Sequence, residues 1–125
     1  MLTDHDAMAT IAVKDIVAAR KFYEETLHFK RSGSDSGAIS TYRSGKSTVL
    51  VYQSAYAGTN KATSATWGVG GQLEAIVRNL KDAGVQFEHY DLPGARLEGD
   101  IHIFGDFRAA WFKDPDGNIL HVNSG

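Results

Sequence analysis

The sequence predicts a single α+β domain of 125 residues in which one pattern, β-α-β-β-β, occurs twice. Each occurrence opens with a strand-like run and a stripe of apolar residues at helical spacing, then continues with short strand-like runs separated by glycines. The two modules cover about residues 8–53 and 64–123, and a small, polar connection at 54–63 joins them. An α+β sheet without an internal repeat fits the same elements, but the paired strand–helix openings favour the repeat.

The first module begins with a strand at 8–14, after which Asp15 offers a side-chain oxygen to cap a helix. Three strand-like runs follow the helix, at 29–32, 38–43 and 47–53. The apolar stripe that predicts the helix consists of Ile16, Ala19, Phe22, Tyr23 and Leu27.

The second module repeats this order from a strand at 64–69. Its helix ends at Gly84, which takes the position after the C-cap. A strand at 85–89, a glycine-rich loop at 91–106 and strands at 107–113 and 118–123 complete the module. The helical stripe consists of Leu73, Ile76, Val77 and Leu80.

A turn with a clear mechanism joins the last two strands, Asp114-Pro115-Asp116-Gly117. Proline presets φ at a central position, aspartate bonds its own backbone, and glycine takes the position of positive φ. The sequence therefore predicts a hairpin that closes the chain.

Composition excludes several classes of function. The formal net charge is −2 and no run of Lys and Arg is interleaved with aromatic residues, so we expect neither nucleic acid nor a membrane surface as partner. No cysteine is present, which excludes thiolate chemistry and fits a cytoplasmic location. The sequence shows no signal-peptide pattern at its start and no apolar run of the roughly 20 residues that span a bilayer.

Three segments, in order, resemble the vicinal-oxygen-chelate superfamily of glyoxalases, extradiol dioxygenases and antibiotic-binding resistance proteins. They are the opening Ile11-Ala12-Val13-Lys14-Asp15 with Phe22-Tyr23 and Leu27-His28-Phe29, the run from Leu80 to Val85, and the terminal hairpin from Asp114 to Val122. The resemblance covers nearly the whole chain. It implies that the two modules curl a mixed sheet around an open-sided cavity and that the protein forms a homodimer.

The resemblance also implies where a metal would bind, because the metalloenzymes of the family place one ligand on each of four strands. The corresponding residues here are Met8, Leu50 or a neighbour, Ser64 and His121. Divalent ions require several carboxylate or imidazole ligands, and this set supplies one imidazole. We therefore predict no metal and no cofactor.

Strand alternation sorts the side chains that would face the cavity. A register shift of one residue would exchange Leu50 and Tyr52 for Val49 and Val51. Trp111 is a stacking wall or, alternatively, a core aromatic. The predicted ligand-binding residues are Met8, Thr10, Leu50, Tyr52, Ser64, Thr66, Trp111 and His121.

His121 is the candidate catalytic residue, because an imidazole on this face can act as a base or hydrogen-bonding group near neutrality. A purely structural role is the alternative. His28 and His89 are expected at the surface. Two further clusters are expected to be solvated edges or loops: Asp4, His5 and Asp6, and Glu98, Asp100 and His102.

Three functions follow. The preferred one is a metal-free protein that sequesters a small, partly aromatic ligand in the cavity, because the inward side chains are apolar or hydroxyl-bearing. The second is an enzyme, either a lyase or isomerase that uses His121 as base or a dioxygenase-like protein with displaced metal ligands. The third is a regulatory protein that senses a ligand.

Overall fold

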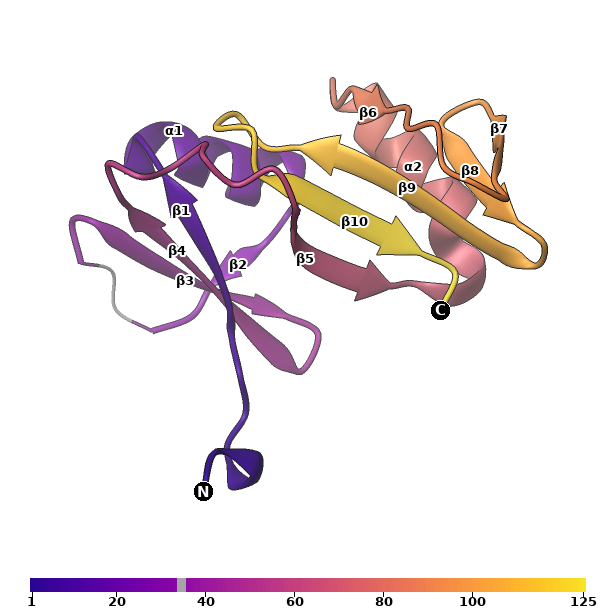
Figure 1. Ribbon diagram of the computed structural model, residues 1–125. Coiled ribbons are helices and arrows are strands. Elements are labelled where there is room, and N and C mark those ends of the chain that lie inside the picture. Colours follow the sequence, from indigo (N-terminus) through magenta and orange to yellow (C-terminus); the bar gives the residue numbers. More distant parts are fainter. Residues whose placement is uncertain (34–35) are drawn as a thin grey trace. The chain divides into compact units, whose positions relative to one another are not determined.

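A computed structural model describes residues 1–33 and 36–125 (Figure 1). The chain divides into two compact units, Met1–Asn60 and Lys61–Gly125, each with its own sheet. The predicted α+β class and the paired β-α-β-β-β order are confirmed, with one additional hairpin in the second unit. Within the described residues, no helix is both long enough and apolar enough to cross a membrane.

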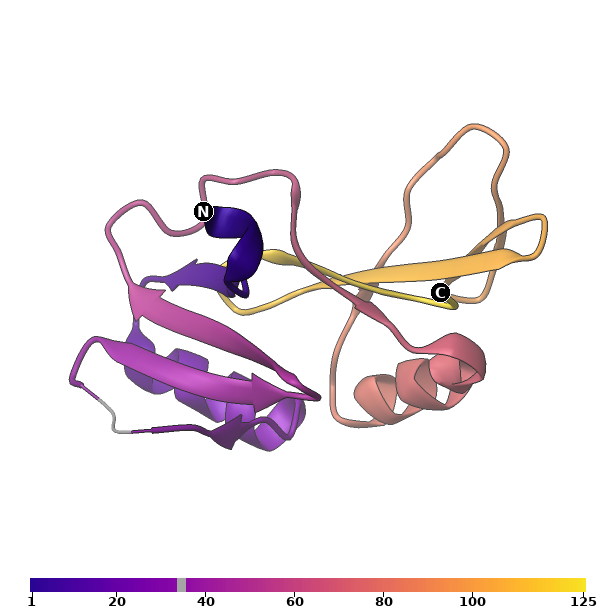
Figure 2. The same ribbon diagram turned by 90° about the horizontal axis from the view of Figure 1, so that it is seen from below.

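The first unit holds a four-stranded sheet in the order β1-β4-β3-β2, in which β1 and β4 are parallel and the other neighbours are antiparallel. The helix α1 covers one face of this sheet (Figure 2). An N-terminal arm, residues 1–8, reaches away from the sheet (Figure 1). The elements are a 3-10 turn (Leu2–Asp4), β1 (Ala9–Val13), α1 (Ile16–Lys21), a π-helical turn (Phe22–Thr26), β2 (Lys30–Arg31), β3 (Ile39–Ser44) and β4 (Ser47–Gln53).

The face of this sheet that packs under α1 is apolar and buried. Val49 and Val51 of β4 lie on this face, while Leu50 and Tyr52 alternate with them and stay half-buried on the other. The structure thus selects one of the two registers that the sequence left open. The other buried residues of this layer include Ile11, Val13, Ile16, Ala19, Tyr23 and Tyr42.

The first helix starts as predicted and ends differently. The Asp15 side chain accepts hydrogen bonds from the backbone N–H groups of Val17 and Ala18, so it caps the helix. Beyond Lys21 the chain forms a wider π-turn, in which the Leu27 N–H bonds the carbonyl of Phe22. The predicted α-helix is therefore shorter than its apolar stripe. His28 follows with a φ of 61° and ends the helical segment.

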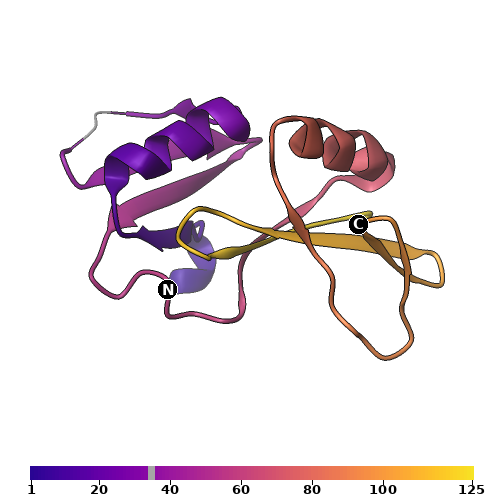
Figure 3. The same cartoon turned by 90° about the horizontal axis from the view of Figure 1, so that it is seen from above.

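The second unit holds a six-stranded sheet in the order β5-β10-β9-β8-β7, with β6 also paired to β9. The first and last strands of the module, β5 and β10, are parallel, as β1 and β4 are in the first unit. The helix α2 covers one face (Figure 3). The elements are β5 (Thr63–Gly68), a 3-10 turn (Gly70–Gln72), α2 (Leu73–Asp82), β6 (Phe87–Glu88), β7 (Arg96–Glu98), β8 (Ile101–Phe104), β9 (Phe107–Lys113) and β10 (Ile119–Asn123).

The segment 91–106, predicted to be a glycine-rich loop, instead contains the hairpin of β7 and β8. Two Gly-Asp pairs make the connections: Gly99-Asp100 joins β7 to β8, and Gly105-Asp106 joins β8 to β9. Both glycines have a φ of 59°, as a tight two-residue turn with glycine first requires. The loop prediction was wrong because these glycines mark two strand reversals six residues apart, and glycine-rich composition alone does not distinguish tight turns from a loop.

The second helix ends as predicted. Gly84 has a φ of 96°, its N–H bonds the Lys81 carbonyl, and the Val85 N–H reaches back to the Leu80 carbonyl. This is a Schellman motif, which satisfies carbonyls that the helix end leaves free. Under the helix lies an apolar layer of Leu73, Val77, Val85, Ala110, Phe112, Leu120 and Val122.

The predicted turn at Asp114 is confirmed, and its carboxylate organises it. The buried Asp114 side chain accepts bonds from the backbone N–H groups of Asp116 and Asn118 and from the Asn118 side-chain amide, at 2.8–2.9 Å. Gly117 has a φ of 85° and donates its N–H to the Asp114 carbonyl. This turn fixes where β10 begins and therefore which side chains of β10 leave the core.

Candidate functional site

Strand pairing places one row of three side chains across the helix-free face of each sheet. In the second unit the row is Thr66 on β5, His121 on β10 and Trp111 on β9. The matching row of the first unit is Thr10 on β1, Leu50 on β4 and Thr41 on β3. We call each row after its unit: Thr10, Leu50 and Thr41 are the first row, and Thr66, His121 and Trp111 are the second row. The predicted ligand-binding residues Thr10, Leu50, Thr66, Trp111 and His121 all fall on them.

His121 lies at the centre of the second row and has both ring nitrogens engaged. Its ring stacks on that of Trp111, with centroids 4.4 Å apart and planes inclined by 20°. Nδ1 lies 3.1 Å from the Ala110 carbonyl oxygen, and Nε2 lies 3.1 Å from the amide nitrogen of Asn123. The side chain is 9% exposed. It is therefore a held, largely buried imidazole.

The environment keeps His121 neutral. Burial lowers the pKa of the imidazole from its ordinary value of 6.5, and the neighbouring ring of His102 adds to this effect. The hydrogen bond to the Ala110 carbonyl acts in the opposite direction but is the smaller effect. At neutral pH the ring therefore bonds as a neutral donor and acceptor.

His102 overturns the expectation of a solvated cluster, because only 1% of it is exposed. It lies on β8, in the hairpin that the sequence did not predict, and its Nε2 accepts a 2.9 Å bond from the Tyr90 N–H. Its ring meets Trp111 edge-on, with centroids 5.0 Å apart. In the part of the chain that the structure describes, His102 Nδ1 and the Tyr90 hydroxyl have no hydrogen-bond partner.

The rest of that cluster is partly fixed and partly exposed. Asp100 is half-buried and bridges Lys81 of α2, at 2.9 Å, and His89, at 2.8 Å. These two partners lower the pKa of Asp100, although desolvation, the largest single contribution, acts against them. Glu98 is exposed, and so are His28, His89 and the cluster of Asp4, His5 and Asp6, as expected.

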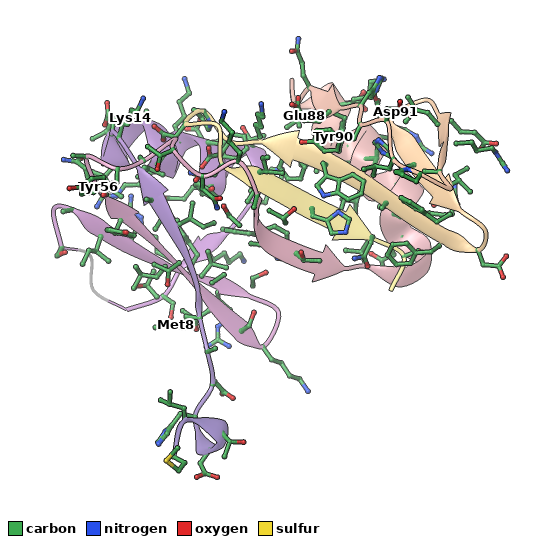
Figure 4. The ribbon with its side chains drawn as sticks, in the orientation of Figure 1. Met8, Lys14, Tyr56, Glu88, Tyr90 and Asp91 are labelled. Carbon is green, nitrogen blue, oxygen red and sulfur yellow. The ribbon has the colours of Figure 1, made fainter. Side chains whose placement is uncertain are left out.

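Each unit also carries a hollow of its own. The hollow of the second unit, about 360 Å³, lies along the segment between β6 and β8. Its lining is His89, Tyr90, Asp91, Leu92, Ala95, Arg96, Leu97 and His102. Figure 4 shows Glu88, Tyr90 and Asp91 gathered beside β9. The hollow of the first unit, about 470 Å³, is lined by Asp6, Ala7, Met8, Lys46, Ser47 and Thr48.

The remaining predicted residues lie off the rows. Met8 is exposed where the N-terminal arm enters β1 (Figure 4), and Tyr52 follows Leu50 by two positions on β4. Ser64 lies between Thr63 and Ala65, which pair with Ile119 and Leu120, so it is the extra residue of a β-bulge. Strand alternation therefore does not decide on which face of the sheet the Ser64 side chain lies. The sequence alone did not reveal this bulge.

Asn123, His102 and Tyr90 were not among the predicted site residues. Asn123 carried a usable signal, because two residues apart on a strand share a face and its amide therefore lies within reach of His121. The sequence signal for His102 was weaker. The apolar residues around it, from Ile101 to Phe104, are typical of a buried strand.

The donors present do not fit the metal site that the fold family implies. A thioether, an aliphatic chain, a hydroxyl and one imidazole occupy the positions of Met8, Leu50, Ser64 and His121. Across residues 1–33 and 36–125, no group of three His, Asp or Glu side chains is placed so that it could hold a metal ion.

Two β-α-β-β-β modules, each with parallel first and last strands and one helix-free sheet face, define a protein of the vicinal-oxygen-chelate type. Residues 7–122 match the family model of the Glyoxalase/Bleomycin resistance protein/Dioxygenase superfamily. The chain belongs to this superfamily.

Solved structures share the fold at low sequence identity. A mutant of the fosfomycin resistance protein FosX from Listeria monocytogenes, complexed with Mn(II) and 1S,2S-dihydroxypropylphosphonic acid, matches with a TM-score of 0.72, 13% identity and coverage of 100% of this chain and 92% of that one. FosX from Mesorhizobium loti gives a TM-score of 0.69, 12% identity and coverage of 100% and 94%. Lactoylglutathione lyase from Agrobacterium tumefaciens gives a TM-score of 0.69 and 13% identity, with coverage of 95% of this chain and 92% of that one. No curated protein sequence matches the chain.

Proposed function

We propose that this protein binds and sequesters a small, partly aromatic molecule on the helix-free face of its second sheet, without a metal ion. One observation carries the proposal: the second row presents a half-buried indole, Trp111, stacked on a neutral imidazole, His121, beside the exposed hydroxyl residue Thr66. Aromatic faces with a few placed polar groups are typical of small-molecule sites.

The same geometry disfavours the enzymatic alternative. A general base works best when its pKa lies near the working pH, and burial lowers the pKa of His121, so its imidazole is a weaker base than a solvent-exposed one. The first row consists of aliphatic and hydroxyl side chains and contains no group that titrates near neutrality.

We also propose that the protein works in the cytoplasm as a homodimer. Apolar side chains support the dimer: Leu97 on the edge strand β7 is 44% exposed, and Ile39 on β3, next to the short edge strand β2, is 40% exposed. Light scattering should give the mass of a dimer at micromolar concentration. A monomer mass would contradict this part of the proposal.

The test of binding uses the two tryptophans, Trp67 and Trp111. In a Trp67→Phe variant Trp111 is the remaining reporter, and a panel of small planar aromatic compounds should include some that quench its fluorescence saturably and raise the melting temperature. The reciprocal Trp111→Phe variant should show weaker quenching, because Trp67 lies on the helix side, in register with Val122. A panel without a saturable binder would contradict the proposal.

Two further measurements separate the alternatives. Mass spectrometry should recover the bound compound unchanged, whereas turnover would favour the enzyme. Elemental analysis of the purified protein should find divalent metal far below one equivalent, and stoichiometric metal would overturn the metal-free mode.

A further inference from the structure

The hydrogen bonds around His121 determine which of its nitrogens carries the proton. The Ala110 carbonyl oxygen can only accept, so Nδ1, at 3.1 Å, must donate to it. In a neutral imidazole the other nitrogen then holds a lone pair, so Nε2 is an acceptor. The second row therefore offers a ligand an acceptor at its centre.

Asn123 covers that acceptor. Its amide nitrogen lies 3.1 Å from Nε2 of His121, and its side-chain oxygen accepts a 2.9 Å bond from the Gly125 N–H. These two contacts orient the amide with its NH₂ group toward the imidazole. Asn123 is half-buried, so its side chain has solvent to turn into when another donor takes its place.

The charges around the row disfavour an anion. Lys113, on the same strand as Trp111, is paired with Glu88 at 3.1 Å. His102 accepts a bond through Nε2, as a neutral ring does, and burial lowers the pKa of His121. A carboxylate or phosphonate would therefore meet a lone pair instead of a cation. The FosX structure, in contrast, is complexed with Mn(II) and a phosphonic acid.

We infer that the ligand is an uncharged aromatic compound bearing a hydrogen-bond donor, such as a phenolic O–H or an amide N–H. Its ring packs beside Trp111, and its donor displaces the Asn123 amide from Nε2 of His121. This inference rests on the proposed function and adds the chemical class of the ligand.

Three matched probes test the class by isothermal titration calorimetry at neutral pH. 2-Naphthol carries a donor, 2-methoxynaphthalene has the same rings without one, and 2-naphthoate is an anion. The naphthol should bind about tenfold more tightly than the methyl ether, the difference expected for one hydrogen bond to a partly buried acceptor. The naphthoate should bind most weakly.

Variants assign the preference to named atoms. His121→Phe keeps a stacking ring and removes Nε2. The tenfold preference for naphthol over the methyl ether should therefore disappear, so that the ratio of the two affinities is about one. Asn123→Ala uncovers Nε2 and should strengthen naphthol binding without strengthening binding of the ether. Asn79→Ala is the matched control, because Asn79 is an exposed residue of α2, and its preference should equal that of the unmodified protein.

Nitrogen-15 NMR of the unmodified protein gives a readout that needs no variant. Naphthol should shift the resonance of the unprotonated nitrogen of His121, and the ether should leave it in place. Equal affinities for naphthol and ether, or tightest binding of naphthoate, would overturn the ligand class and leave the proposed function standing. If neither these probes nor the wider aromatic panel binds saturably, the proposed function itself fails.

Discussion

The two rows differ in chemistry although strand pairing places them at matching positions. Thr10, Leu50 and Thr41 form the first row, and Thr66, His121 and Trp111 form the second. The outer threonine is the same in both, while the centre changes from leucine to histidine and the third position from threonine to tryptophan. A shared topology thus fixes positions and leaves their chemistry free.

The units also differ in what borders the row. In the first unit the strand β2 pairs with β3 near its end, and in the second unit β6 pairs with β9 at the corresponding place. The second unit adds the hairpin of β7 and β8 along the rest of β9. This addition brings the buried His102 against Trp111 of the second row.

The largest expected effect comes from removing the side chain that most distinguishes the rows. Trp111→Ala removes the stack on His121 and the edge contacts with Tyr90 and His102, so the free energy of unfolding should fall by about 3 kcal/mol. Thr41→Ala, at the matched position, should cost less than about 1 kcal/mol. Urea unfolding measures both, and equal losses would contradict the contrast between the rows.

A second contrast between the units lies in the turns that precede β4 and β10, the strands that carry the central residue of each row. β4 is entered through the Gly45-Lys46 turn, and β10 through the turn that Asp114 organises. Asp114→Ala leaves buried N–H donors unsatisfied and should lower the free energy of unfolding by about 2 kcal/mol. Asp114→Asn keeps an acceptor and should lose less.

Lys46 gives the matched comparison for that turn, because its exposed side chain lies in the equivalent hairpin of the first unit. Lys46→Ala should change the free energy of unfolding by no more than about 0.5 kcal/mol. If Asp114→Ala were equally harmless, the carboxylate would not be what holds the turn.

Much of the fold could be predicted because its determinants are local. Asp15 caps a helix and Gly84 ends one through contacts a few residues away, and strand alternation put Leu50 and Tyr52 on one face and the valines beside them on the other. The bulge at Ser64 could not be predicted in this way, because a bulge depends on the register with the neighbouring strand.

The sheet face of the candidate site residues was predictable from the sequence, but their side-chain contacts were less so. Strand alternation brought His121 and Trp111 onto the helix-free face, yet the stack and the bond to Asn123 depend on rotamers that the sequence does not specify. His102 was misplaced because its burial comes from Tyr90 and the surrounding segment, whose hairpin was not expected.

The pH dependence of stability separates the centres of the rows, because Leu50 does not titrate and His121 does. Folding lowers the pKa of His121, so the unfolded chain takes up a proton first as the pH falls through 6.5. The contribution of His121 to the free energy of unfolding is therefore fully present above pH 6.5. It is lost as the pH falls from there through the pKa of His121 in the folded protein. Urea unfolding between about pH 8 and about pH 5 should show a decline that is smaller in His121→Phe. Identical declines would mean that other groups cause it.

The smallest expected effect compares two tyrosine hydroxyls, one in each unit. The hydroxyl of the buried Tyr42 donates to Glu24 at 2.9 Å, and burial together with that carboxylate raises the pKa of Tyr42 to about 12. The Tyr90 hydroxyl is buried and, among the described residues, has no hydrogen-bond partner. Tyr42→Phe should therefore lower the free energy of unfolding by about 1 kcal/mol.

Tyr90→Phe should leave the free energy of unfolding unchanged or raise it slightly, because it removes a polar atom whose desolvation no hydrogen bond offsets. Both variants keep the ring and its aromatic contacts, with Tyr23 and Phe29 for Tyr42 and with His102 and Trp111 for Tyr90. Their difference therefore isolates the hydroxyl. A loss in Tyr90→Phe as large as that in Tyr42→Phe would show that the Tyr90 hydroxyl is hydrogen-bonded in solution, for example to a bound water molecule beside His102.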